Sequence, residues 1–118
     1  HPLDVARMTE AGRLMLGEHD WTAFSSAQAD GENRVRTVSE LEISTLWDAR
    51  ANASLIEIRV SANGFLRYMV RSIVGTLIEV GQGQKDSDTI QTAIVSGDRS
   101  LAGKTAPAHG LTLHKVYY

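Results

Sequence analysis

An apolar stripe with helical spacing runs through residues 66–78 and constrains the fold more than any other feature of the sequence. Its successive members lie three or one residues apart and repeat with the period of a helix: Leu66, Met69, Val70, Ile73, Val74, Leu77 and Ile78. This pattern places the side chains on one side of an α-helix. Gly81 and Gly83 follow the stripe, as glycines do where a helix ends. So wide an apolar face requires a second layer of structure to cover it.

Two alternating segments upstream can supply that layer. In Val35–Leu46, Leu41 and Ile43 face one way and the neighbouring glutamates face the other, which is typical of a half-exposed strand. After a loop expected over Trp47–Ser54, the segment Leu55–Ala62 alternates again. The two segments are predicted to pair as an antiparallel hairpin.

Two more helices are predicted outside this central unit. The first covers Leu3–Leu16, with Asp4 in its first turn and Gly17 as its terminator. The second is shorter, covers about Ser87–Val95, and has Gly97 just beyond its end.

The chain is expected to end with a loop over Asp98–Gly110 and a strand over Leu111–Tyr117. The order α-β-β-α-α-β predicts an α+β fold, a ferredoxin-like (RRM-like) sandwich in which helices pack on one face of an antiparallel sheet. One strand before His1 would complete that unit. Because the chain also opens on His1 rather than on methionine, we expect it to be a piece of a longer protein whose first strand lies upstream.

Composition excludes several classes of protein. With 118 residues, 42% hydrophobic and 22% charged, the chain is typical of one globular domain. No segment reaches the roughly 20 apolar residues of a membrane span. The absence of cysteine excludes disulfides and thiolate zinc sites, and it fits a reducing, cytoplasmic setting. The four histidines fall at no metal-ligand spacing.

Charge is distributed unevenly along the chain, although the net charge is only −2. Residues 1–60 hold six Lys/Arg and ten Asp/Glu, whereas residues 61–118 hold six and four. Any contact with nucleic acid is therefore expected in the second half, as a local basic patch.

Arg67 and Arg71 are the first candidates for that patch. They lie four residues apart, so on one helix they would project in nearly the same direction, beside a small or polar stripe of Tyr68, Ser72 and Gly75. Two guanidinium groups so placed suit a phosphate or a carboxylate. The alternative is an ordinary solvated helix face.

Four sequence blocks resemble one family, in the order in which that family has them. The segment ANGFLRYMVRSIVGTLIEVGQG, Ala62–Gly83, resembles the signature helix of the tRNA pseudouridine synthase A (TruA) family. The other three blocks are Gly17–Phe24, Val35–Ile43 and Ala102–Tyr118. The resemblance therefore covers nearly the whole chain.

The resemblance implies an isomerase that converts uridine to pseudouridine in the anticodon stem-loop of tRNA, without a metal or organic cofactor. Enzymes of this family have two similar α/β halves around a basic cleft, and they are usually homodimers. Their catalytic aspartate belongs to an R-T-D motif in the N-terminal half. Residues 1–118 resemble only the C-terminal half, and Arg36 and Thr37 are followed by Val38, so they do not form that motif. The chain is therefore expected to be inactive by itself.

Five site residues follow from the resemblance and from charge. Arg71 matches the family's arginine that pairs with the catalytic aspartate, and Leu111 matches an apolar residue near the target base. Arg67, Arg99 and Lys104 are candidates for phosphate contacts. A core leucine and solvated charges remain the alternative interpretations.

Two other function classes stay open. An autonomous ferredoxin-like RNA-binding module would carry aromatic residues on its strands, but the predicted strands hold none before Tyr117 and Tyr118. A dimerisation domain could use Trp21, Phe24 and Trp47 as a subunit contact. Exposure of these three side chains would distinguish such a contact from core packing.

Overall fold

A computed structural model describes residues 3–26, 33–50 and 52–103. The predicted last strand, Leu111–Tyr117, lies outside this range, as do the candidate site residues Lys104 and Leu111. None of the helices within the described ranges is long and apolar enough to cross a membrane.

The sheet has three antiparallel strands in the order β1-β2-β3. They are β1 (Gly17–Asp20), β2 (Val35–Asp48) and β3 (Ala53–Ala62). The predicted hairpin is confirmed, but it is longer than expected: β2 continues past Leu46, and Trp47 pairs with Ser54 inside the segment predicted as a loop. The short strand β1 was not predicted, since its four residues give no alternating pattern.

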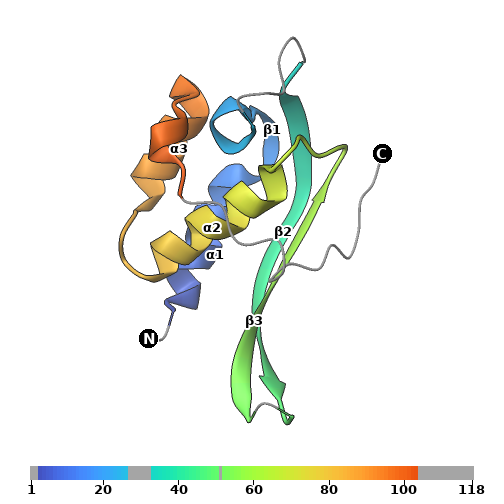
Figure 1. The fold of residues 1–118 in the computed structure, drawn as a ribbon, viewed down its shortest axis with the longest axis vertical. Helices are drawn as coiled ribbons and strands as arrows, with labels where there is room; N and C mark the ends of the chain where they lie inside the picture. Colours follow the sequence, from blue (N-terminus) through green and yellow to red (C-terminus); the bar gives the residue numbers. More distant parts are fainter. Residues whose placement is uncertain (1–2, 27–32, 51, 104–118) are drawn as a thin grey trace.

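The outer end of the β2–β3 hairpin extends beyond the helices, toward the bottom of Figure 1. Three large apolar side chains are exposed there: Leu46 (45%), Trp47 (64%) and Leu55 (47%). Because neither face of the hairpin is covered at this end, the sequence carries no inside–outside alternation there. This explains why the end of β2 was predicted two residues too early and the start of β3 two residues too late.

Three helices lie on one side of the sheet, α1 (Val5–Met15), α2 (Met69–Gly81) and α3 (Ser87–Ser96) (Figure 1). This arrangement confirms the predicted α+β, ferredoxin-like fold class. Asp4 precedes α1 as its N-cap, accepting a 3.1 Å hydrogen bond from the backbone N–H of Arg7, so its predicted place inside the first turn is wrong. Gly12 lets α1 approach β2, since a Cβ there would lie 2.6 Å from Cδ2 of Leu41.

The apolar face of α2 forms the centre of the core, as its periodicity predicts. Met69, Ile73 and Leu77 are fully buried, together with residues from α1, α3 and the segment after β1. In that segment Trp21 packs edge-on against Phe24 at 5.4 Å, and the Trp21 indole N–H donates a 3.1 Å hydrogen bond to the carbonyl oxygen of Arg36. Both aromatic side chains are fully buried, so they belong to the core and not to a subunit contact.

Candidate functional site

The chain enters α2 through a strained turn at Tyr68. This residue adopts left-handed backbone angles, φ 66° and ψ 2°, and α2 begins at the next residue. Left-handed backbone costs an L-residue about 1–2 kcal/mol. The prediction that Arg67 and Arg71 lie on one helix is therefore wrong for Arg67, which precedes the turn. The periodicity did not reveal this, because Leu66 is buried although it lies outside the helix.

Hydrogen bonds and buried anchors hold the turn on both sides. The N–H of Met69 donates to the carbonyl oxygen of Leu66 at 3.0 Å, and the N–H of Ser72 donates to that of Tyr68 at 2.9 Å. Leu66 and Met69 point into the core. From outside, the N–H of Ser26 donates to the carbonyl oxygen of Arg67 at 3.0 Å. These contacts compensate for the strain at Tyr68.

The two arginines still converge, although not along a helix face. The guanidinium carbons of Arg71 and Arg67 lie 4.9 Å and 5.2 Å from the centroid of the Tyr68 ring. Both distances are within the range of cation–π attraction. Of the stripe expected beside them, only Tyr68 is exposed, since Ser72 and Gly75 are buried.

Arg99 reaches the same region from a different part of the chain. It begins a short 3₁₀ helix, Arg99–Leu101, and its Nε donates a 3.0 Å hydrogen bond to the carbonyl oxygen of Ser25. A longer contact of 3.5 Å joins its Nη2 to the carbonyl oxygen of Ser26. Asp98 caps this helix, and hydrogen bonds from the hydroxyl and the backbone N–H of Ser100 lower the pKa of the Asp98 carboxyl.

Arg34 completes what we call the arginine cluster: Arg34, Arg67, Arg71 and Arg99. Its Nη1 lies 3.5 Å from the hydroxyl oxygen of Ser25. The sequence did not point to Arg34, because it belongs to the acidic first half of the chain. The Arg-x-Arg spacing of Arg34 and Arg36 at the start of β2 was the available signal.

The segment after Arg99 returns to α2 one turn beyond Arg71. The N–H of Gly103 donates a 2.8 Å hydrogen bond to Oγ1 of Thr76, whose hydroxyl donates to the carbonyl oxygen of Ser72 at 2.7 Å. Gly103 lies so close to the helix that a Cβ there would be 2.7 Å from Cα of Thr76 and would also meet the carboxylate of Glu79. Only glycine fits, so the chain leading to Lys104 and Leu111 starts from a fixed point on α2.

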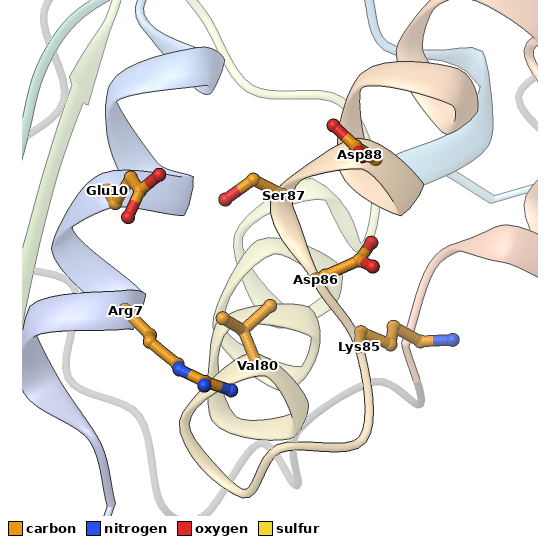
Figure 2. A pocket seen from close by; sticks show the side chains of 7 residues that line it. All are labelled: Arg7, Glu10, Val80, Lys85, Asp86, Ser87 and Asp88. Atoms are coloured by element: carbon orange, nitrogen blue, oxygen red, sulfur yellow. The ribbon is translucent and has the colours of Figure 1, made fainter.

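A pocket of about 340 Å³ lies at the other end of α2 (Figure 2). Its lining comes from α1, the end of α2 and the start of α3: Arg7, Glu10, Val80, Lys85, Asp86, Ser87 and Asp88. Charges of both signs line it, and none of the predicted site residues is among them. Across the described parts of the chain, no three histidine or carboxylate groups come together to hold a metal ion.

Comparison with known proteins gives one consistent family. The family model described as "tRNA pseudouridine synthase" matches residues 11–118. The tRNA pseudouridine synthase A of Geobacillus sp. (strain WCH70) is 48% identical over 118 residues, which are 100% of this chain and 45% of that protein. The protein of the same name from Bacillus subtilis (strain 168) is 40% identical over 116 residues, 98% of this chain and 44% of that protein.

The chain thus spans less than half the length of these curated relatives. The family match covers most of the chain and includes all of α2, β2 and β3, which carry or support the arginine cluster. The identity of 40–48% extends over the same residues. From this match and this similarity, the chain belongs to the tRNA pseudouridine synthase family.

Proposed function

We propose that this chain is the C-terminal half of a tRNA pseudouridine synthase that isomerises uridine in the anticodon stem-loop of tRNA. The observation that carries the proposal is the position of Arg71, in the first turn of α2, within an arginine cluster that extends beyond the helix. The names of the relatives indicate the reaction, and the resemblance of the Ala62–Gly83 block indicates which half of the enzyme this chain is.

In the proposed reaction, the N-glycosidic bond between N1 and C1′ breaks, the uracil turns, and C5 bonds to C1′. The C5 proton is lost and N1 gains one, so the reaction is an isomerisation and needs no oxidant or reductant. An R-T-D motif would place the aspartate directly after Arg36 and Thr37, but Val38 occupies that position. The catalytic aspartate is therefore assigned to the N-terminal half.

Arg71 orients that aspartate. A guanidinium group can donate two parallel hydrogen bonds to one carboxylate, which fixes its rotamer and favours its ionised form. The buried face of α2 fixes the helix and therefore the origin of the Arg71 side chain, whose own exposure is intermediate. Such preorganisation strengthens electrostatic interactions in a cleft that excludes water.

The remaining cations and the tail bind the RNA. Arg67 and Arg99 are exposed and supply phosphate contacts, with Lys104 as a third. Leu111 packs on the uracil. Support for these last two roles comes from Gly103, whose hydrogen bond to Thr76 brings the chain next to α2 just before Lys104.

The proposed partners are tRNA and the N-terminal half of the enzyme, in a cytoplasmic homodimer. Exposure of Trp47, Leu46 and Leu55 favours a second role for this half, a subunit contact at the outer end of the hairpin. Since Trp21 and Phe24 are buried, Trp47 is the one aromatic residue of the predicted contact that is open to a partner.

Tritium release tests the proposed function. The full-length protein and the 118-residue chain, its folding verified by circular dichroism, are each incubated with tRNA that carries tritium at C5 of uridine. We expect release by the full-length protein and none above background by the chain. Turnover by the chain alone would contradict the half-enzyme assignment, and an inactive full-length protein would contradict the proposed reaction.

A further inference from the structure

We propose that Tyr68 is a positioning residue for Arg71: its ring holds the guanidinium group in the direction that the aspartate of the other half requires. This inference rests on the proposed function of Arg71. It assigns Tyr68 a role through Arg71 and not through direct contact with the reacting uridine.

The geometry of the ring is the first observation. Tyr68 is 41% exposed, and the guanidinium carbon of Arg71 lies 4.9 Å from its ring centroid. An arginine side chain has many rotamers, and a contact that restricts them before the partner arrives makes ordering on binding less costly. The ring attracts the cation by its quadrupole, so it restricts the guanidinium without neutralising its charge.

The backbone of Tyr68 is the second observation. Left-handed angles are disfavoured for a bulky residue and are tolerated better by asparagine or glycine. Tyr68 is the N-cap residue of α2 but makes no capping hydrogen bond with its side chain, and the side chain is not buried in the core. Neither helix capping nor core packing accounts for a tyrosine at a strained position, whereas its contact with Arg71 does.

The surroundings of the turn explain how the ring stays in place. Leu66 and Met69 anchor the turn in the core, and the Ser26 N–H holds the carbonyl oxygen of Arg67. The Cα–Cβ direction of Tyr68 is therefore fixed relative to α2, on which Arg71 is carried. The second cation, Arg67, lies 5.2 Å from the same ring. With two guanidinium groups against it, the ring is better suited to hold arginines than to stack on a nucleobase.

Three substitutions in the full-length protein separate the ring from the strain. Tyr68→Phe keeps the ring, Tyr68→Leu removes it at similar bulk, and Tyr68→Asn removes it while favouring the left-handed backbone. We expect Tyr68→Phe to retain kcat within about twofold, and Tyr68→Leu to lower kcat about fivefold with little change in KM for tRNA. Tyr68→Asn should also lower kcat about fivefold, although its Tm should rise because strain is relieved.

A double-mutant cycle gives the decisive readout. In an Arg71→Lys background, where the planar guanidinium is already lost, Tyr68→Leu should lower kcat much less than in the wild-type background. As a readout independent of catalysis, the Arg71 Nε–H resonance of the full-length protein should carry a ring-current shift. That shift should persist in Tyr68→Phe and disappear in Tyr68→Leu.

The outcomes that overturn the inference are distinct from those that overturn the proposed function. A wild-type protein that forms no pseudouridine overturns the proposed function. An active protein whose Tyr68→Leu variant keeps the wild-type kcat overturns only the positioning role. A loss that is expressed in KM, and that is equally large in the Arg71→Lys background, would instead assign Tyr68 to direct contact with the RNA.

Discussion

The backbone N–H of Ser26 donates a 3.0 Å hydrogen bond to the carbonyl oxygen of Arg67, while the carbonyl oxygen of Ser26 faces Arg99. One residue thereby connects the backbone at Arg67 to the guanidinium group of Arg99, which lies far from it in the sequence. The bond also supports the strained turn from which α2 and Arg71 begin. The segment after β1 is therefore part of the framework of the arginine cluster as well as of the core.

Arg99 is expected to have a structural role and an RNA-binding role that can be measured separately. Arg99→Ala loses the hydrogen bond to the carbonyl oxygen of Ser25, so the free energy of unfolding should fall by about 1 kcal/mol. Arg99→Lys keeps the charge but not the guanidinium geometry. In the full-length protein, both variants should show a lower Tm, and only Arg99→Ala should lose tRNA affinity and reduce the salt dependence by about one phosphate contact. Equal tRNA binding by both variants would leave Arg99 a structural residue.

Arg71 provides the strongest test of the proposed mechanism. If its guanidinium orients the catalytic aspartate, Arg71→Lys should fail almost as severely as Arg71→Ala, because an ammonium group cannot donate two parallel hydrogen bonds to one carboxylate. We expect kcat of the full-length enzyme to fall about 10²–10³-fold in both variants. KM for tRNA should change far less, since other phosphate contacts remain. A phosphate-binding arginine predicts the reverse: lysine restores most of the activity, and the loss appears in KM.

The sequence could predict the elements in which one face is buried and the other exposed. The stripe of α2 and the alternation around Leu41 both reflect such a difference, and the structure confirms the two elements. The extension of β2 through Trp47 could not be predicted, since both faces of the hairpin are open there.

The candidate site was predictable by residue but not by geometry. Arg71 could be found from the resemblance, and Arg67 from its spacing to Arg71. The turn at Tyr68 could not be found, because an apolar residue at position 66 fits the helical period whether or not the helix has begun. The joint contact at Ser25–Ser26 depends on segments far apart in the sequence, and no local pattern records it.

Gly103 is expected to tolerate no side chain. In Gly103→Ala the new Cβ would clash with Cα of Thr76, a backbone atom that cannot move aside as a flexible side chain can. We expect the variant to lose the hydrogen bond to Thr76 and, in the full-length protein, to lose activity because the chain at position 103 no longer lies against α2. Thr76→Val removes only the hydroxyl, and Thr76→Ser retains it; the first should reproduce part of the loss and the second almost none. Tritium release and thermal unfolding report the two effects, and a fully active Gly103→Ala enzyme would contradict the prediction.

The Asp86 carboxyl should make the folding stability depend on pH in the acid range. Hydrogen bonds from the backbone N–H and the hydroxyl of Thr89 lower the pKa of the Asp86 carboxyl below its ordinary value of 3.8. These hydrogen bonds favour the ionised carboxylate in the folded state, so the ionised form stabilises the fold. Its contribution is fully present above about pH 4 and is lost as the pH falls through the lowered pKa.

The Asp86→Asn variant tests this, because asparagine can still cap α3 but carries no charge. Its Tm should lie below that of the wild type at pH 7, and the difference should shrink as the pH falls below about 4. Asp98→Asn should behave alike, since its pKa is lowered by the equivalent bonds from Ser100. A Tm difference that stays constant across this range would rule out titration as its cause.

Trp47 is expected to form a subunit contact in the full-length protein. Its side chain is 64% exposed beside Leu46 and Leu55 at the end of the hairpin. Exposure of so large an apolar group to water is unfavourable, and burying it against a partner would be favourable. Trp47→Ser should therefore weaken dimerisation, lowering the mass measured by light scattering at micromolar concentration, without lowering Tm by the amount typical of a core substitution. Val95→Ser is the matched control, since Val95 is 82% exposed on α3, away from the hairpin, and its variant should keep the wild-type mass. If Trp47→Ser also keeps that mass, the hairpin end is not the subunit contact, and Trp47 is an exposed side chain without this role.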